Sequence, residues 1–262
     1  MKNVVITGST RGLGFYLARQ FLMSGCNVTV SGRYERSLMD AGDELGKYSE
    51  KLFLVKCDVR DRNDIENLWN ASKEKWGKID IWINNAGQNC PYEFIYDTDQ
   101  ADVDSLVDTN IKGVIFGSQI AARGMISQGY GQIWNIEGLG SNNMIQEKTI
   151  LYGASKHALT YLAKGLAKEL TGTGVFSGRL SPGMMLTDFI TKTCDGAISP
   201  VLGDKRFLKI FRILADRPET VAPFLVRKML ANKKNGTHIV WLTNGKAMLR
   251  FLSGRKLDMG CL

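Results

Sequence analysis

Short apolar runs alternate with longer amphipathic stretches along this chain, beginning within its first residues. The runs are rich in Val and Ile and end at small or polar residues, which is typical of buried strands. We expect strands at 3–7, 27–31, 52–56, 79–83, 132–136, 175–180 and 238–242. The stretches between them repeat apolar residues at helical spacing. In 158–170, one helix face carries Ala158, Leu159, Leu162, Leu166 and Leu170.

Alternation of strands and helices predicts an α/β fold, in which right-handed crossovers make the strands mostly parallel. We expect a single doubly wound Rossmann domain over 1–262, with a mostly parallel seven-stranded sheet flanked by helices. Segment 184–235 has helical patterns without a strand, and we expect it to form an excursion on the substrate side. Residues 243–262 follow the last expected strand as a basic C-terminal extension.

The composition excludes several classes of protein. With 262 residues, 44% of them hydrophobic, the chain can bury one substantial core. No run approaches about twenty uncharged apolar residues, so we expect no membrane span. Five scattered cysteines and a start that runs directly into a strand-like segment favour a cytoplasmic location. Two histidines far apart in sequence indicate that there is no metal site.

The net charge of +8 is unevenly distributed. Residues 201–262 contain 13 Lys and Arg against 4 Asp and Glu, a net charge of +9, so the rest of the chain is nearly neutral. Basic segments bind nucleic acid, anionic membranes or acidic ligands, or are simply solvated surface, which is the interpretation we favour. No zinc-finger spacing or aromatic RNA-binding signature is present, so we do not expect nucleic-acid binding.

A glycine-rich turn, TGSTRGLG, follows the first expected strand. Its residues Gly8, Gly12 and Gly14 permit a tight turn and let a pyrophosphate approach the backbone at the start of the next helix. At the end of the second strand, an acid would bind the free ribose of NAD, but Arg33 stands there. Arg11 lies in the turn itself. Guanidinium groups suit a 2′-phosphate, so we expect NADP(H) as the cofactor.

Tyr152 and Lys156 in YGASK are four residues apart, which places them on one face of a helix. A free tyrosine has a pKa near 10 and transfers protons poorly at neutral pH, whereas a neighbouring ammonium lowers that pKa. Such a pair is common on helices, so its meaning depends on the motifs around it.

Several motifs together resemble the short-chain dehydrogenase/reductase family over essentially the whole chain. They occur in the order of the family: the glycine turn, CDV with Asp58 and Val59, NNAG at 84–87, Asn110 in DTNIKG, YGASK, and SPGMMLT at 181–187.

The resemblance implies a role for each matching residue. Tyr152 would donate a proton to a substrate carbonyl, and Lys156 would bind the nicotinamide ribose and lower the Tyr152 pKa. Asn110 would hold a water in a proton relay to Lys156. The cofactor would carry the hydride. Its contacts would be Gly8, Ser9, Thr10, Arg11, Gly12, Leu13, Gly14, Arg33, Asp58, Val59, Asn85, Ala86, Gly87, Tyr152, Lys156, Pro182, Gly183 and Thr187.

The serine that most family members carry after the fifth strand is missing. Aligning QIWNI with that strand puts Gly138 at the position of the serine. A carbonyl that gains a hydride develops negative charge on its oxygen, so we expect a second donor beside Tyr152. We favour the Ser141 hydroxyl, brought back by the flexible glycines of the loop. The other candidates are Glu137, Asn142 and Asn143.

The segments EGLGS, YGASK, LSPGMMLTDF, RPETVA and SGRK narrow the resemblance to the chlorophyll b reductase branch, which reduces a formyl group on a large pigment. We expect an NADPH-dependent oxidoreductase that reduces an aldehyde or ketone to the alcohol, such as a formyl group on a bulky substrate. The alternatives are a 3-oxoacyl thioester or small-ketone reductase and a non-catalytic NADP(H)-binding regulator. Long helices near 100–127 and 153–170 pack subunits together in the family, which implies a homodimer or homotetramer.

Overall fold

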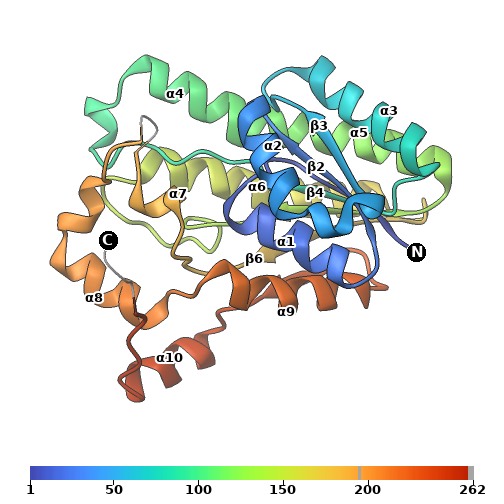
Figure 1. Ribbon diagram of the computed structural model, residues 1–262. Helices are drawn as coiled ribbons and strands as arrows, with labels where there is room; N and C mark the ends of the chain where they lie inside the picture. Colours follow the sequence, from blue (N-terminus) through green and yellow to red (C-terminus); the bar gives the residue numbers. More distant parts are fainter. Residues whose placement is uncertain (194–195, 259–262) are drawn as a thin grey trace.

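The computed structural model describes residues 1–193 and 196–258, which form a seven-stranded parallel sheet with helices on both sides (Figure 1). The strands lie in the order β3-β2-β1-β4-β5-β6-β7, and every neighbouring pair is parallel. The predicted doubly wound α/β fold is confirmed, and each expected strand is present. The strands are β1 (Asn3–Ile6), β2 (Asn27–Gly32), β3 (Leu52–Lys56), β4 (Ile81–Asn84), β5 (Gly131–Ile136), β6 (Val175–Ser181) and β7 (His238–Val240).

Helices cover the two faces of the sheet in separate layers. One face carries α1 (Gly12–Met23), α2 (Glu35–Glu44) and α9 (Pro218–Leu230). The other face carries α3 (Arg62–Trp76), α5 (Gly113–Gln128) and α6 (Ile150–Glu169). Shorter elements complete this part: 3-10 turns η1 (Gly46–Lys51) and η2 (Ile95–Asp97), helix α4 (Gln100–Val107) and the π-helical turn η3 (Asp108–Lys112).

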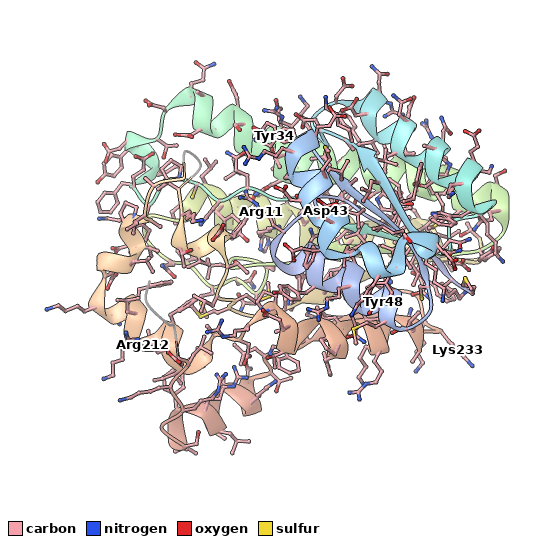
Figure 2. The ribbon with its side chains drawn as sticks, viewed as in Figure 1. Arg11, Tyr34, Asp43, Tyr48, Arg212 and Lys233 are labelled. Atoms are coloured by element: carbon pink, nitrogen blue, oxygen red, sulfur yellow. The ribbon has the colours of Figure 1, made fainter. Side chains whose placement is uncertain are left out.

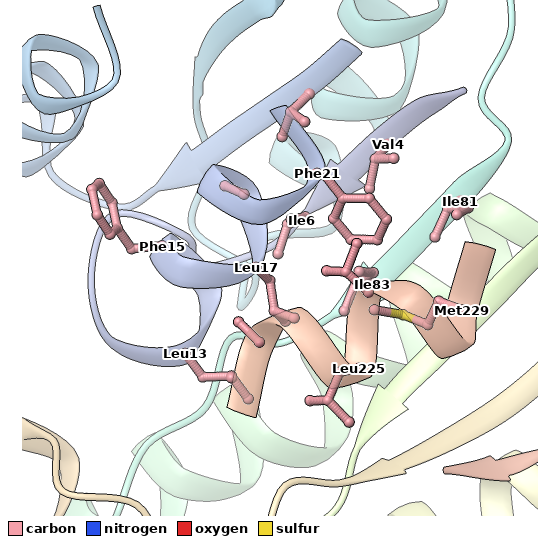
Figure 3. Close-up of a cluster of buried hydrophobic side chains, with 14 of the residues drawn as sticks. Val4, Ile6, Leu13, Phe15, Leu17, Phe21, Ile81, Ile83, Leu225 and Met229 are labelled. Atoms are coloured by element: carbon pink, nitrogen blue, oxygen red, sulfur yellow. The ribbon is translucent and has the colours of Figure 1, made fainter. Parts of the chain in front are cut away.

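The larger core lies between the sheet and the paired helices α1 and α9 (Figure 3). Leu17 and Phe21 of α1 and Leu225 and Met229 of α9 are fully buried with Val4 of β1. Apolar residues recur three or four positions apart along α1, so they share the face that meets the sheet. Each such side chain stabilises the fold by about 1.5–3 kcal/mol when buried. The packing of α1 and α9 on the sheet therefore holds β1, the strand that leads into the glycine turn.

All strands direct their carboxyl ends to the same edge of the sheet, because all are parallel. The strand order reverses between β1 and β4, and at such a point an open α/β sheet forms a crevice that holds ligands. The glycine turn follows β1, the NNAG motif follows β4, and the loop at 137–149 follows β5. The candidate motifs therefore converge on one edge.

The described residues of the 184–235 excursion contain no strand, as expected. They form α7 (Asp188–Thr191), the 3-10 turn η4 (Pro200–Gly203), α8 (Lys205–Leu214) and α9. Helix α9 packs on α1 in the main core, and the position of the excursion on the substrate side stays a prediction. The extension contains α10 (Asn244–Leu252). Within the described ranges, no helix has the length and apolar character needed to cross a membrane.

Candidate active site

The glycine turn between β1 and α1 packs tightly against the loop that follows β4. At Gly8, φ is +59°, and a Cβ there would lie 2.8 Å from the Cα of Ala86, so this approach requires glycine. The Asn85 Nδ2 donates to the carbonyl oxygens of Thr7 and Gly8, at 2.9 and 2.8 Å. A Cβ at Gly14 would collide with the Asn85 amide. The two motifs assigned to the cofactor thus form one rigid wall.

The first turn of α1 fits a pyrophosphate. Arg11 is the N-cap residue but makes no side-chain cap, and the first turn contains no acidic residue. The N–H groups and the dipole at the start of a helix favour an anion. A Cβ at Gly12 would meet Thr187 Cγ2 only at 3.9 Å, so the space beside the turn is open. The residues present therefore fit the phosphates of a dinucleotide.

Other residues of the glycine turn support the sheet. Ser9 is fully buried, and its hydroxyl donates to the Ile6 carbonyl oxygen at 2.7 Å. Leu13 belongs to the core under α1. Thr10 lies over Gly32, where a Cβ would be 2.5 Å from the threonine methyl. The side chains of Ser9 and Leu13 are therefore used by the fold, and contact of these residues with a cofactor would come from the backbone.

Arginines surround Asp58 at the carboxyl ends of β2 and β3. Arg33 follows β2 directly and is exposed, as is Arg11 in the glycine turn (Figure 2). Arg60 pairs with Asp58 at 2.5 Å. Burial raises the pKa of Asp58, but the Arg60 hydrogen bonds and the nearby Arg33 charge outweigh it and hold that pKa below its usual value. Val59 is buried beside this pair. Arg60 was not among the predicted site residues, because no motif marks it.

The turn after β6 lies at the other end of the crevice. At Gly183, φ is +78°, and a Cβ there would lie 2.9 Å from Leu242 Cβ. Pro182 is buried beside it. Thr187 is the N-cap residue of α7, and its methyl faces the open side of Gly12. This turn therefore stands across from the glycine turn, on the side where the nicotinamide is expected.

The structure brings Tyr152 and Lys156 together on α6. The Lys156 Nζ lies 5.7 Å from the centre of the Tyr152 ring and donates to the Ile136 carbonyl oxygen at 3.2 Å. Lys156 is 4% exposed, so its ammonium is enclosed at the end of β5. Phe189 of α7 packs against the tyrosine ring at 5.7 Å. The excursion thus supplies one wall around the phenol.

Asn110 is fully buried in the π-helical turn η3, a type of turn that often marks functional sites. Its Nδ2 donates to Ser155 Oγ at 3.1 Å and to the Gln88 carbonyl at 2.9 Å. Its Oδ1 accepts from the Gln88 N–H at 2.7 Å. A Cβ at Gly87 would lie 3.5 Å from Asn110 Oδ1 and 3.6 Å from Lys156 Nζ. Three motifs therefore meet at Gly87. Gln88 and Ser155 were not among the predicted site residues, although both adjoin motif residues.

Burial dominates the protonation of Tyr152 and Lys156. It lowers the pKa of Lys156 to about 8, against the opposing effect of the Glu137 charge. It raises the pKa of Tyr152 above the usual value. The expectation that Lys156 lowers the Tyr152 pKa is wrong here, because burial disfavours the phenolate and the ammonium donates to Ile136. A phenol that keeps its proton at neutral pH is suited to protonating an oxyanion.

Gly138 lies directly against the Tyr152 hydroxyl. A Cβ at Gly138 would collide with the phenol oxygen and would lie 3.2 Å from Lys156 Cγ. The space that a serine side chain would need is therefore taken by the phenol. The position of the Tyr152 phenol therefore explains why residue 138 is glycine and not serine.

The Ser141 hydroxyl is engaged within the loop. It accepts from the Gly138 N–H at 3.2 Å and donates to the Lys156 carbonyl at 3.1 Å. Its only proton is directed at the backbone of α6, so this arrangement does not support the expected donation to a substrate oxygen. The hydroxyl ties the loop to α6 instead. The asparagines at 142–143 are exposed turn residues.

Four side chains contact the carboxylate of Glu137, which lies in the same loop as Ser141. Arg179 Nη1 and Thr160 Oγ1 donate to Oε1, both at 2.9 Å. Ser181 Oγ and His238 Nε2 contact Oε2 at 2.5 and 2.8 Å. Burial raises the pKa of Glu137, but hydrogen bonds from His238, Ser181 and Thr160 outweigh it and hold the pKa at about 2. The carboxylate is ionised, and its charge is already compensated.

A helix terminus that fits a pyrophosphate, next to a half-buried tyrosine and a buried lysine, is the arrangement of an oxidoreductase. The short chain dehydrogenase family model matches residues 2–196. This chain belongs to the short-chain dehydrogenase/reductase family, as its motifs predicted.

Curated relatives include a probable chloroplastic chlorophyll(ide) b reductase of Oryza sativa subsp. japonica, 34% identical over 96% of this chain. This chain spans about half of that protein, 52% of its length. A chloroplastic chlorophyll(ide) b reductase of Arabidopsis thaliana, NOL, is also 34% identical and is covered over 73% of its length. The predicted resemblance to this branch is confirmed.

Solved structures agree with this assignment. A short-chain type dehydrogenase/reductase from Mycobacterium marinum superposes with a TM-score of 0.81 at 25% identity, over 94% of this chain and 95% of that one. A serine dehydrogenase complexed with NADP⁺ superposes with a TM-score of 0.80 at 26% identity, over 92% and 94% of the two chains. The family and its solved members support a nicotinamide cofactor for this chain.

Proposed function

We propose that this chain is an NADPH-dependent carbonyl reductase in which Tyr152 is the proton donor. The observation that carries the proposal is that Asn110 and Lys156 meet at Gly87, with the Tyr152 ring beside Lys156 and a helix terminus that fits a pyrophosphate. When bound, the nicotinamide cofactor supplies the hydride, and the protein supplies position and a proton.

Tyr152, Lys156 and Asn110 have different roles, which follow from their burial and hydrogen bonds. Tyr152 keeps its proton because burial raises its pKa, so it can protonate the oxyanion that forms when a carbonyl accepts a hydride. Lys156 is buried next to it, and its ammonium can bind a ribose hydroxyl. Asn110 fixes the Gln88 backbone and Ser155, and thereby the distance between the β4 loop and α6.

We assign the cofactor as NADP(H) on the basis of Arg33 and Arg11, which are exposed beside the expected ribose site. Dissociation constants for NADPH and NADH, measured by fluorescence titration, test this point. We expect NADPH to bind at least about tenfold more tightly, since guanidinium–phosphate contacts are charge-assisted. Arg33→Asp should remove that preference, and equal constants in the unmodified protein would refute the assignment.

The proposed substrate is an aldehyde or ketone on a bulky, partly apolar molecule, and a formyl group on a tetrapyrrole is the first choice. The support is the names of the plant relatives and the aromatic side chains on the loop that follows β4. Phe94 and Tyr96 stack with ring centres 5.3 Å apart, and both side chains are exposed. Lys148 lies 5.1 Å from the Phe94 ring. A flat apolar molecule would find stacking partners there.

The proposal is tested by following NADPH oxidation with a panel of a formyl tetrapyrrole, small aldehydes, small ketones and a 3-oxoacyl thioester. Turnover of the formyl compound supports the assignment, whereas turnover of the thioester alone would move the chain to the rival reductase class. Tight NADPH binding without any turnover would identify a non-catalytic regulator. The homo-oligomer and the cytoplasmic location stay predictions, and the plant relatives are named as chloroplastic.

A further inference from the structure

Helix α10 carries its apolar side chains on the outside. Met248 is 60% exposed, Leu249 64%, Phe251 50% and Leu252 77%. The one buried residue of the helix is Arg250, which is 8% exposed. A surface helix of a soluble domain normally directs its apolar face to the core and its charges to water. We call the four exposed side chains the α10 patch.

Buried charged side chains fix α10 with its apolar residues facing outward. Asp216 is 3% exposed and accepts from Arg250 Nη2 at 2.7 Å, from Arg255 Nη2 at 2.7 Å and from Trp241 Nε1 at 2.6 Å. Arg250 Nη1 also donates to the Leu214 carbonyl at 2.7 Å. Turning the helix over would take Arg250 away from the buried Asp216 carboxylate, and removing one partner of a buried ion pair is strongly unfavourable. The patch is therefore held outward by the fold.

Positive charges lie beside the α10 patch. α8 packs on α10 and exposes Lys209 and Arg212 (Figure 2), and Lys256 is exposed just beyond α10. The Leu257 N–H donates to the Arg212 carbonyl at 2.6 Å, which joins the two segments. Figure 1 shows both helices at one end of the molecule, away from α3 and α5. The segment 201–262 carries a net charge of +9.

The apolar and cationic groups together favour one of three binding partners for the α10 patch: a second copy of the chain, a nucleic acid or an anionic membrane. A symmetric contact with a second copy would place the same cations opposite one another, because a two-fold interface pairs each patch with itself. A nucleic acid would use the cations and leave the aliphatic side chains in water. An anionic membrane surface satisfies both, since apolar side chains enter the headgroup region and Lys and Arg bind the lipid charges.

We propose that the α10 patch, with Arg212 and Lys256, docks this chain on an anionic lipid surface. The docking is peripheral and reversible, as it uses one short helix and a few cations. It brings α8 and the excursion that walls the Tyr152 site next to the bilayer. An apolar carbonyl compound dissolved in the membrane would then reach the site without crossing water.

The test is co-sedimentation of the full chain with vesicles of mixed phosphatidylglycerol and phosphatidylcholine, compared with phosphatidylcholine alone. We expect binding to the mixed vesicles, weaker binding at high salt, and at least about tenfold weaker partitioning after the double change Leu249→Ser and Leu252→Ser. Met248→Ser should weaken binding, and Met39→Ser, which removes a side chain of matching exposure at 62%, should not. Arg212→Glu should weaken binding to the mixed vesicles.

Several results would overturn the proposal. These are failure to sediment with the mixed vesicles, equal binding of the double variant, and equal binding to both vesicle types. A dimer in analytical ultracentrifugation that the double variant dissociates, without vesicle binding, would assign the patch to a second copy. Duplex DNA binding that the double variant retains, without vesicle binding, would assign the cations to nucleic acid. Circular dichroism checks that the variants fold, and none of these readouts depends on reductase activity.

Discussion

Two buried carboxylates, Glu137 and Asp216, are both neutralised by arginine, but Glu137 fixes a loop beside Tyr152 and Asp216 fixes the surface helix α10. Each is 3–4% exposed and each is paired with arginine. Glu137 precedes Gly138, which lies against the Tyr152 hydroxyl, so its network fixes that loop against the phenol. Asp216 fixes α10 with its apolar side chains in water.

The hydrogen-bond networks of Glu137 and Asp216 therefore control different properties of the protein. A residue behind the loop at 137–141 controls the distance between backbone and phenol, on which proton transfer depends. A residue beneath α10 controls which face of that helix meets the surroundings. The Asp216 carboxylate bonds to Trp241, Arg250 and Arg255, none of which is a candidate site residue. We therefore expect changes at Glu137 to affect stability and turnover together, and changes at Asp216 to separate them.

Glu137→Gln should have the largest effect. It leaves Arg179 without its carboxylate, and breaking a buried pair in this way costs about 3 kcal/mol of unfolding free energy. Urea unfolding at neutral pH measures the loss, and we expect reduced NADPH oxidation as well. A variant with parental stability would show that the network contributes little.

The same variant has a defined pH dependence. The folded-state pKa of Glu137, about 2, is below the ordinary value of 4.5, so its stabilisation is complete above pH 4.5 and declines as the pH falls toward 2. The stability gap between parent and Glu137→Gln should therefore narrow from pH 7 to pH 3. A constant gap would contradict the ionised carboxylate.

Gly138→Ala should lower kcat by about 100-fold, because the added Cβ must displace the Tyr152 hydroxyl, and a misplacement of about 1 Å has effects of this order. Gly165→Ala on the same helix as Tyr152 is the matched control, since a Cβ there meets nothing within 4 Å. Steady-state NADPH oxidation compares the two variants. Parental turnover of Gly138→Ala would mean that the loop and the phenol separate during catalysis.

Asp216→Asn should lower the unfolding free energy by about 2 kcal/mol, somewhat less than Glu137→Gln because Arg255 is partly exposed and water can reach it. The main-chain hydrogen bonds of Asp216 to Met184 and Leu186 remain, so kcat should stay within about twofold. Vesicle binding should weaken as α10 loosens. A loss of turnover equal to that of Glu137→Gln would remove the distinction between the two networks.

Ser141→Ala should have the smallest effect, about 1 kcal/mol of stability, since it removes one hydroxyl that bonds only to backbone. Its kcat should fall less than tenfold. A loss of 10- to 100-fold at unchanged NADPH affinity would instead restore Ser141 as the donor to the substrate oxygen.

The sheet and the cofactor crevice could be predicted because their signals are local. The strands appear as short apolar runs, and the glycine turn and YGASK each lie within a few consecutive residues. The partners of Glu137 lie 23 to 44 residues away for Thr160, Arg179 and Ser181, and no local pattern identifies them. For this reason the sequence leaves Glu137 among the candidates for the second donor and does not show that the Ser141 hydroxyl is already bonded within the loop.

The orientation of α10 was unpredictable for a related reason. The helical spacing of its apolar residues identifies a face, but the face that is buried depends on Asp216, which is 34 and 39 residues from Arg250 and Arg255. The pKa of Tyr152 was expected to fall because Lys156 is near in sequence. Burial, which depends on the whole fold, decides the direction instead.

The central claim, that Tyr152 is the proton donor of a carbonyl reductase, is tested most directly by a single-turnover measurement on Tyr152→Phe. NADPH is bound first, the best carbonyl substrate of the panel is added, and NADPH oxidation is followed by absorbance. We predict an NADPH dissociation constant close to that of the parent and a rate lower by about 10²–10⁴-fold, because the ring keeps its packing and loses the transferable proton. An unchanged rate in Tyr152→Phe would contradict the account.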